Sequence, residues 1–150
     1  MTLRTLFPSD LPQLVLIEQS VSVVPWTADV FTACFDAGYL GWVYEIENRI
    51  VGFVILSLTI EECHILNICV AREFQHQGYG YKLLAHALLH AKSQGVGLAY
   101  LEVRQSNVRA IKLYEKMKFH LIGERKEYYP TLSGREHAHV YALSLYDYEL

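Results

Sequence analysis

A loop with two glycines joins an apolar segment to a helical pattern, and this junction limits the folds that the chain can adopt. The loop has the form Gln-x-x-Gly-x-Gly, with Gln75, Gly78 and Gly80. Isoleucine, valine and cysteine dominate the preceding segment, Cys63–Val70, as is typical of a strand. After the loop, leucines and alanines recur at helical spacing as far as Ala91. A strand, a glycine loop and a helix in this order favour an α/β fold.

The two glycines have more than one interpretation. A glycine turn before a helix leaves backbone N–H groups free at the helix start, where the helix dipole adds about half a positive charge, so a phosphate binds well there. The alternative is that Gly78 and Gly80 only allow a tight turn. The chain lacks the Gly-Lys-Ser/Thr of a Walker loop, and Leu83 stands where a dinucleotide-binding loop needs a small residue. Both of those phosphate loops are excluded.

Composition narrows the class of protein further. A chain of 150 residues is the length of one domain and buries about 70% of its unfolded surface. With 52% hydrophobic residues and a net charge of −3, it is predicted to be globular. A module that binds nucleic acid by neutralising phosphates would carry a basic stripe, which this sequence lacks. Direct binding to nucleic acid is not expected.

Cysteine usage and the N-terminal sequence predict a cytoplasmic location. Cys34, Cys63 and Cys69 are odd in number and form no C-x-x-C pair, so they are expected to be buried thiols and not disulfides or zinc ligands. No segment approaches the ~20 apolar residues of a membrane span. We expect neither a membrane segment nor a secretory signal.

Patterns along the chain predict helices and strands in alternation. One helix begins near Ser9 or Asp10, a second follows Thr27 and ends at Gly38, and a later helix is capped by Ser106. Further strands are expected at residues 41–46, 50–58, 98–103, 119–129 and 137–145. The predicted fold is a single α/β (α+β) domain over residues 1–150. Its central sheet would be mixed and mostly antiparallel, with six to seven strands and about four helices on both faces.

The loop and four other motifs resemble one known family. Gln75, Gly78 and Gly80 match the signature loop with which the GNAT superfamily of acetyl-CoA-dependent N-acetyltransferases holds the coenzyme pyrophosphate. The motifs "NICV", "LEVR", "SN..AI.LYE" and "YYPT..GRE" also resemble the RimI-type acetyltransferases, as do "DLPQLVLIEQS" and "PW" near the N-terminus. That family acetylates the N-terminal alanine of a small-subunit ribosomal protein. The resemblance spans almost the whole chain.

The resemblance implies acetyl-CoA as cosubstrate, without a metal, and a set of coenzyme contacts. These contacts fall on the strand, the loop and the start of the later helix, at Ile68, Cys69, Val70, His76, Gln77, Gly78, Tyr79, Gly80, Tyr81 and Asn107. Two loop positions that are often arginine in the family hold His76 and Tyr81 here. Phosphate binding would therefore depend more on backbone N–H groups and on Lys82.

The family's proton acceptor falls on Glu102. An N-terminal ammonium has a pKa near ~7.8 and must lose a proton before its nitrogen attacks a thioester, so a carboxylate within reach can act as the base. Leu101 and Val103 point to the opposite face of the predicted strand. From spacing alone, a glutamate in this position is more often an exposed residue of an edge strand, or the partner of Arg104 or a lysine, than a catalytic base; the resemblance reverses this order.

The family's proton donor falls on Tyr114. A phenol with a pKa of ~10 can protonate a departing thiolate. Without the resemblance, a tyrosine on the apolar face of a helix is more often a core residue. Cys69 as a covalent acyl acceptor is disfavoured because no histidine is placed beside it. The resemblance also suggests that the amide N–H of Val70 supports the oxyanion that develops on the acetyl carbonyl.

The acceptor site is expected at aromatic residues. Trp26, Tyr128 and Tyr129 are candidates for holding an extended peptide, although each can also be a packing residue. The acceptors of RimI-type enzymes are basic beyond the alanine, and four glutamates around the predicted hairpin are compatible with this, namely Glu45, Glu47, Glu61 and Glu62. The pairs His86/His90 and His137/His139 lack a third ligand and are expected to be surface histidines.

Two other functions remain open at this stage. The coenzyme loop does not determine the acceptor, so the chain can be a GNAT enzyme that acetylates a lysine side chain, a polyamine or an antibiotic amine. It can also be a regulator that binds acyl-CoA without turnover, although the presence of both Glu102 and Tyr114 disfavours this. We expect an enzyme whose partners are acetyl-CoA and the N-terminal peptide of a ribosomal protein.

Overall fold

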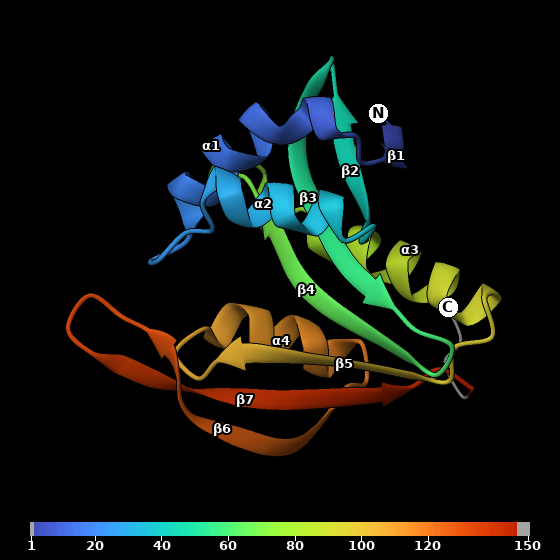
Figure 1. Cartoon of the computed structure of the whole chain (residues 1–150), viewed down its shortest axis with the longest axis vertical. Coiled ribbons are helices and arrows are strands. Elements are labelled where there is room, and N and C mark those ends of the chain that lie inside the picture. The colour runs from blue at the N-terminus through green and yellow to red at the C-terminus, as the bar shows by residue number, and fades with distance from the viewer. Residues whose placement is uncertain (1, 147–150) are drawn as a thin grey trace.

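The computed structural model describes residues 2–146, which form a seven-stranded sheet with two helices on each face (Figure 1). The strand order is β1-β2-β3-β4-β5-β7-β6. The strands are β1 (Thr2–Thr5), β2 (Leu40–Ile46), β3 (Arg49–Leu58), β4 (Glu62–Val70), β5 (Leu98–Arg104), β6 (His120–Pro130) and β7 (Arg135–Ser144). The α-helices are α1 (Leu11–Val21), α2 (Ala28–Asp36), α3 (Tyr79–Ser93) and α4 (Val108–Lys116), with short 3-10 turns at Pro8–Asp10 and Arg72–Phe74. The predicted α/β fold is confirmed.

Strand pairing is antiparallel throughout this sheet except between β4 and β5. Helix α3 follows β4 and leads to β5, as a parallel crossover requires. The sequence analysis did not predict β1, whose four residues pair with Trp42–Glu45 of β2. Among residues 2–146, no helix is long and apolar enough to cross a membrane.

Two apolar clusters hold the helices on opposite faces of the sheet. Helices α1 and α2 pack on one face through Leu14 and Phe31, which meet Phe53 of β3. Helices α3 and α4 pack on the other face through residues such as Leu83 and Met117. Apolar residues at helical spacing on each helix therefore meet the side of the sheet to which alternate strand residues point.

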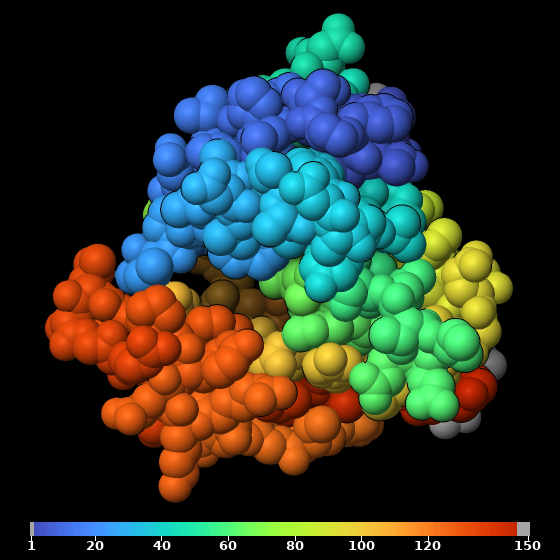
Figure 2. All heavy atoms as spheres, in the orientation of Figure 1, coloured from blue at the N-terminus to red at the C-terminus, as the bar shows by residue number. Residues whose placement is uncertain are grey.

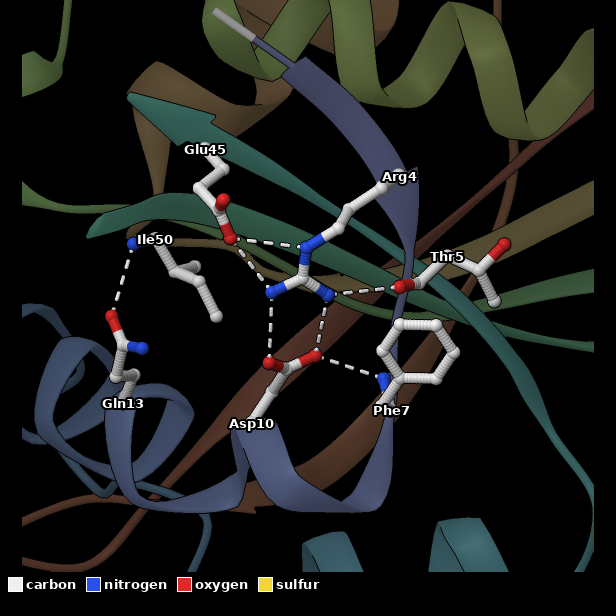
Figure 3. Close-up of polar contacts among 7 residues, drawn as sticks. All are labelled: Arg4, Thr5, Phe7, Asp10, Gln13, Glu45 and Ile50. Carbon is white, nitrogen blue, oxygen red and sulfur yellow. Dashed lines mark hydrogen bonds and ion pairs between the residues drawn. The ribbon is translucent and has the colours of Figure 1, made fainter. Parts of the chain in front are cut away.

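A buried ion-pair network fixes β1 and the start of α1 (Figure 3). Arg4 lies between Asp10 and Glu45, with its Nη2 at 2.9 Å from Asp10 Oδ1 and 2.8 Å from Glu45 Oε2. Asp10 also accepts a hydrogen bond from the Phe7 amide at 2.8 Å. Burial would raise the pKa of the Asp10 carboxyl, but these hydrogen bonds outweigh it and lower that pKa. The Asp10 side chain therefore accepts hydrogen bonds from Arg4 and from the Phe7 amide, which both precede α1, and it does not cap that helix.

Two other predicted helix ends agree with the structure, and a third does not. The Thr27 hydroxyl accepts a hydrogen bond from the Val30 amide at 3.4 Å, which caps α2. Gly38 follows α2 with a φ of 76°, a left-handed conformation that favours glycine. Ser106 is not the cap of α4, contrary to the prediction, because the next residue, Asn107, accepts the capping bond from Ala110 at 3.2 Å.

Candidate active site

The parallel strands β4 and β5 separate halfway along their length. Their pairing runs from Glu62 opposite Leu98 to Ile65 opposite Leu101. Beyond these residues the described strands diverge, and Figure 1 shows the opening between them. A bulge contributes to the divergence, because β3 pairs Ile55 with Asn67 and then Leu56 with Ile65. Leu66 is the extra residue, and a bulge bends the strand that carries it.

The backbone of β4 turns toward this opening at Val70. The Ala71 amide donates to the Val51 carbonyl at 2.8 Å, so Ala71 faces β3. Because N–H and C=O directions alternate along a strand, those of Val70 face the opening. The Val70 carbonyl accepts a hydrogen bond from Gln75 Nε2 at 2.9 Å. The Val70 amide N–H, predicted as an oxyanion donor, therefore points where that role requires.

Cys69 points away from the opening. Its side chain is buried in the cluster beneath α1 and α2. Burial raises the pKa of its thiol to about 12, and Glu18 contributes in the same direction. A thiol that stays protonated is a poor nucleophile. The sequence-based argument against a covalent acyl-cysteine agrees with this environment, and a contact between Cys69 and the coenzyme would be through the backbone.

The loop after β4 presents the N-terminus of α3 beside the opening. Gly78 is the N-cap residue, with a φ of 87°, and His76 also has a positive φ of 64°. Glycine has no side chain with which to cap a helix, and the Lys82 amide donates to the Gly78 carbonyl at 3.1 Å. The backbone N–H groups of Gly80 and Tyr81, in the first turn before Lys82, have no acceptor within the helix. N–H groups at a helix start are suited to binding an anion.

The two glycines of the loop have different structural roles. The backbone at position 78 is left-handed, with a φ of 87°, and this conformation favours glycine, as the tight-turn interpretation states. Gly80 lies inside α3, and a Cβ atom there would be 3.6 Å from Leu113 Cδ2 and 3.8 Å from Val70 Cγ2. These are ordinary contact distances. The fold therefore has room for a side chain at Gly80, and a bound ligand is the better reason for a glycine there.

Cationic side chains approach the loop from α3 and α4. Lys82 Nζ lies 5.8 Å and 5.7 Å from the ring centres of Tyr44 and Tyr79, and Lys116 Nζ lies 5.1 Å from that of Tyr81. Arg109 donates a hydrogen bond to Gln75 Oε1. Gln77 donates to the Glu73 carbonyl at 3.3 Å. The sequence analysis named Lys82 as a phosphate contact but did not name Arg109 or Lys116. These two residues lie on α4, about 30 residues further along the chain.

Glu102 lies on β5 at the mouth of the opening, on the face opposite α3 and α4. Leu101 and Val103 pack with those helices, so the side chain between them points to the other face. The Glu102 side chain is 7% exposed. Its Oε2 lies 2.5 Å from His64 Nε2, and its Oε1 lies 3.3 Å from Arg125 Nε. The hydrogen bond with His64 lowers the pKa of the Glu102 carboxyl, although burial acts in the opposite direction.

Tyr114 lies on α4, buried among Met117, Phe119 and other residues of the α3–α4 cluster. Burial raises the pKa of its hydroxyl well above the ordinary value, and Tyr129 acts in the same direction. Among the residues that the structure describes, none forms a hydrogen bond with that hydroxyl. A buried hydroxyl without a partner is uncommon in a folded protein. Its position fits both a packing residue and a proton donor to a bound ligand.

Tyr129 links the two predicted catalytic residues in space. It lies near enough to interact electrostatically with both Glu102 and Tyr114. The Arg104 guanidinium stacks over the Tyr129 ring at 4.6 Å and donates to the Pro130 carbonyl at 2.6 Å. Tyr128 packs edge-on against Tyr129 at 4.9 Å. The predicted Tyr128–Tyr129 pair therefore joins the site from β6.

A hollow on the molecular surface leads to this region. Figure 2 shows it between the connection from α1 to α2, the hairpin of β6 and β7, and strand β4. Trp26 lies in the first of these borders, with its ring 5.3 Å from Phe31. Its amide donates to Glu18 Oε2 at 2.9 Å, and Asn67 Nδ2 lies 3.3 Å from Glu18 Oε1. The predicted acceptor residues thus belong to two of the segments that border the hollow, the α1–α2 connection and β6.

Glu18, His64 and Arg125 were not found from the sequence. Each reaches the site from a different element, and each partner is distant in the chain. Two of the four glutamates proposed to attract a basic acceptor are placed differently from expectation. Glu45 is paired with Arg4 (Figure 3), and the turn between β2 and β3, which carries Glu47, stands at the opposite end of Figure 1 from β6 and β7.

The histidine pairs have other partners. His86 and His90 both contact the Trp42 ring, at 5.1 Å and 5.0 Å between ring centres. His137 Nδ1 accepts a hydrogen bond from the Glu127 amide at 2.9 Å. Within residues 2–146, no group of three or more histidine, cysteine, aspartate or glutamate side chains could hold a metal ion.

Comparison with known proteins gives a consistent set of relatives. Residues 5–119 match the acetyltransferase (GNAT) family. The [ribosomal protein bS18]-alanine N-acetyltransferase of Escherichia coli K12 is 35% identical over 144 residues, covering 96% of this chain and 97% of that protein. The Haemophilus ducreyi enzyme of the same name is 37% identical, covering 95% and 99%. The crystal structure of the Escherichia coli enzyme superposes with a TM-score of 0.90, covering 96% of this chain and 93% of that chain.

Proposed function

The chain belongs to the acetyltransferase (GNAT) family, and on this premise we propose that it transfers the acetyl group of acetyl-CoA to the N-terminal alanine of ribosomal protein bS18. It is an N-acetyltransferase whose named relatives, at 35% to 37% identity, act on that alanine. A ribosomal protein as acceptor also implies a cytoplasmic enzyme. The site supports the proposal because it combines an anion site, a carboxylate and a phenol.

The position of Tyr129 within electrostatic reach of both Glu102 and Tyr114 is the observation that carries the proposal. Acetyl-CoA brings the acetyl thioester that this reaction needs. Backbone N–H groups of the first turn of α3, aided by Lys82, Arg109 and Lys116, are suited to its pyrophosphate. The absence of a side chain at Gly80 allows a ligand to approach the helix closely. The Val70 amide would donate a hydrogen bond to the oxyanion that develops on the acetyl carbonyl.

Glu102 would remove the proton from the acceptor ammonium. Its carboxyl pKa is lowered, so it is ionised at neutral pH and can accept a proton directly or through a water. Arg125 is the weaker of its two partners, since the Nε–Oε1 distance is 3.3 Å and the arginine side chain is 52% exposed. Displacement of Arg125 by an incoming amine would leave Oε1 open toward the hollow.

Tyr114 would supply the proton for the departing sulfur. Its raised pKa keeps the hydroxyl protonated at neutral pH, and its hydroxyl is left without a partner in the described chain. A coenzyme sulfur at the opening would provide that partner. The amine attacks the thioester directly, so no covalent enzyme intermediate forms, and the tyrosinate would regain its proton from solvent.

The experiment is acetyl transfer from labelled acetyl-CoA to short peptides. The test peptide carries the N-terminal sequence of bS18, and matched peptides replace the first alanine by serine or methionine. A control peptide has a blocked N-terminus and an internal lysine. We expect label on the α-amine of the alanine peptide, located by fragment mass analysis.

Other outcomes assign other functions. Label on the lysine Nζ alone, or on a polyamine alone, would contradict the proposed acceptor and retain the enzyme class. Absence of transfer to every amine, with acetyl-CoA still bound, would identify a regulator without turnover.

A further inference from the structure

The part of β6 that borders the hollow departs from regular strand pairing. The register between β6 and β7 shifts between Arg125 and Tyr129, where three residues of β6, at positions 126–128, lie opposite one residue of β7. A bulge of this kind interrupts the backbone ladder and bends the strand that carries it. The segment with Tyr128 and Tyr129 therefore depends on other contacts for its position.

Side chains of β7 hold the bulge itself. Arg135 Nε donates to the Glu127 carbonyl at 2.7 Å, and its Nη2 donates to the Tyr128 carbonyl at 3.1 Å. His137 Nδ1 accepts a hydrogen bond from the Glu127 amide at 2.9 Å. Glu127 has a φ of 49°, a left-handed conformation that a glutamate rarely adopts. These bonds satisfy backbone groups that the interrupted ladder leaves without partners.

Arg104 holds the next residue, Tyr129, from β5. Val103 packs with α3 and α4, so Arg104 points to the opposite face of the sheet, as Glu102 does. Its guanidinium carbon lies 4.6 Å from the centre of the Tyr129 ring, which is within the range of a cation–π contact. Its Nη1 donates to the Pro130 carbonyl at 2.6 Å. Arg104 thus contacts both the ring of Tyr129 and the backbone of the following residue.

Glu136 of β7 keeps the guanidinium in place. Arg104 Nη1 lies 3.3 Å from Glu136 Oε2, and the two side chains are 18% and 17% exposed. Solvent and salt screen such a pair less than they screen an exposed one. Glu136 Oε1 also accepts a hydrogen bond from the Ser106 amide at 3.1 Å. Through Tyr129 and Ser106, the pair connects β5, β6, β7 and the segment that leads into α4, which carries Tyr114.

We propose that Arg104 is a positioning residue that acts through Tyr129 and orients this ring for binding of the acceptor. The inference rests on the acetyl transfer proposed above and on the predicted contact of Tyr129 with the acceptor peptide. A guanidinium is planar and stacks on a ring, whereas the ammonium of lysine is a compact point charge. Without the guanidinium the ring loses this contact. The acceptor should then bind more weakly, while the coenzyme site beside α3 is unaffected.

The test compares Arg104→Lys with the unchanged enzyme in acetyl transfer to the alanine peptide at saturating acetyl-CoA. Lysine keeps a positive charge beside Glu136 but removes the planar group over the ring. KM for the peptide should rise roughly tenfold while kcat stays within about threefold, as expected when only binding is lost. The rise in melting temperature that acetyl-CoA produces should be unchanged.

Arg4→Lys is the matched control for a loss that is only structural. Arg4 also lies over an aromatic ring, that of Phe7 at 5.5 Å, and is paired with Asp10 and Glu45. It belongs to β1, the edge of the sheet opposite β6. The melting temperature of this variant should fall, because lysine cannot replace the forked guanidinium, and its KM for the peptide should stay unchanged.

Tyr129→Leu tests whether Arg104 acts through the ring. If it does, Arg104→Lys should raise KM by less than about twofold when combined with Tyr129→Leu, because the two changes remove the same contact. Independent effects would multiply, and a further rise of roughly tenfold in the double variant would overturn the proposal.

Glu136→Gln addresses the same question without removing a ring, and it decides the matter if Tyr129→Leu does not fold. The substitution removes the charge that holds the guanidinium and leaves Arg104 and Tyr129 themselves in place. KM should rise by a smaller factor than in Arg104→Lys, roughly threefold, with kcat retained. An unchanged KM in this variant would count against the proposal.

The outcomes distinguish this inference from the function on which it rests. An unchanged KM in folded Arg104→Lys would overturn the role of Arg104 and leave the acetyl transfer standing. A rise in KM together with a lost response to acetyl-CoA would also overturn it, since it would reveal a general distortion. If another amine is the acceptor, KM is measured with that amine, so the proposed acceptor can fail while the role of Arg104 stands. A wild-type chain that acetylates no amine would overturn both.

Discussion

Strand β3 is buried along seven consecutive residues, Ile50–Leu56, whereas β6 is exposed along nine, His120–Tyr128. The contrast extends to the two halves of the sheet. Strands β1 to β4 lie between α1 and α2 on one face and α3 on the other. Strands β5 to β7 have α4 on one face, and Tyr100, Glu102 and Arg104 point to the other.

The difference explains where binding and chemistry can take place. A strand packed on both faces cannot admit an acceptor without losing core contacts. It is suited to holding the loop and the start of α3 in position for a coenzyme. The half with one open face can place titratable groups such as Glu102 beside a surface hollow. The site lies at the boundary, where β4 and β5 separate.

The largest expected effect is on the stability of strands β1 to β4, the half of the sheet that helices cover on both faces (the covered half). Phe53→Ala should destabilise the protein by about 3 to 5 kcal/mol, because the ring is fully buried between β3 and α2. Leu121→Ala on β6, where the side chain is 57% exposed, should change stability by less than about 0.5 kcal/mol. Urea unfolding of both variants checks the comparison, and equal losses would contradict it.

The next largest effect is on the rate of acetyl transfer and concerns strands β5 to β7, the half of the sheet with one open face (the open half). Glu102→Gln should lower kcat/KM for the alanine peptide by roughly 100-fold or more, because the amide cannot accept the proton. The loss should shrink at high pH, where the amine is already neutral. Glu124→Gln, an exposed glutamate on β6, is the control and should retain the wild-type rate. A loss below about threefold in Glu102→Gln would remove this residue from the proton-transfer step.

Tyr114 tests whether the face of the sheet that α4 covers also contributes to the chemistry. Tyr114→Phe keeps the ring in its core position, so the free energy of unfolding should change by no more than about 1 kcal/mol. If the hydroxyl is the proton donor, kcat should fall at least roughly tenfold. Full activity between pH 6 and 10 would identify Tyr114 as a packing residue. The measurement is turnover at saturating acetyl-CoA, with stability measured in parallel.

The ion-pair network of β1 provides a pH test of the covered half. The pKa of Asp10 is lowered in the folded state, so its stabilising contribution is present above the unfolded value and is lost as pH falls through the folded one. Asp10→Asn should therefore cost about 2 kcal/mol at pH 7. The difference from wild type should shrink below about pH 4. Thermal unfolding at several pH values measures it, and a constant difference would exclude this linkage.

Gly80→Ala has the smallest expected effect and the most specific one. The structure has room for the added methyl group, so the variant without coenzyme should be up to about 1 kcal/mol more stable, as for other helical glycines. The same methyl group should reduce the rise in melting temperature that acetyl-CoA produces by binding the native state. An undiminished rise would show that the ligand does not approach Gly80 closely.

Much of the molecule could be predicted from the sequence because its signals are local. The period of apolar residues predicted α1 to α4, β2 to β7 and an α/β sheet with helices on both faces. The loop Gln75–Gly80 and the motifs around Glu102 and Tyr114 indicated the family. These signals depend on backbone geometry and on residues a few positions apart. Strand β1 was not predicted, because its four residues are of mixed polarity and show no clear alternation.

The tertiary structure alone decided how these parts meet. The bulge at Leu66 and the separation of β4 from β5 depend on pairing between strands. His64 and Glu102 are 38 residues apart, and Arg4 and Glu45 are 41 apart. No local pattern records such contacts, because a hydrogen bond between side chains depends on register and on the face to which each strand turns its residues. The sequence by itself determined the elements and the residue types of the site, and chain packing determined which of those residues contact one another.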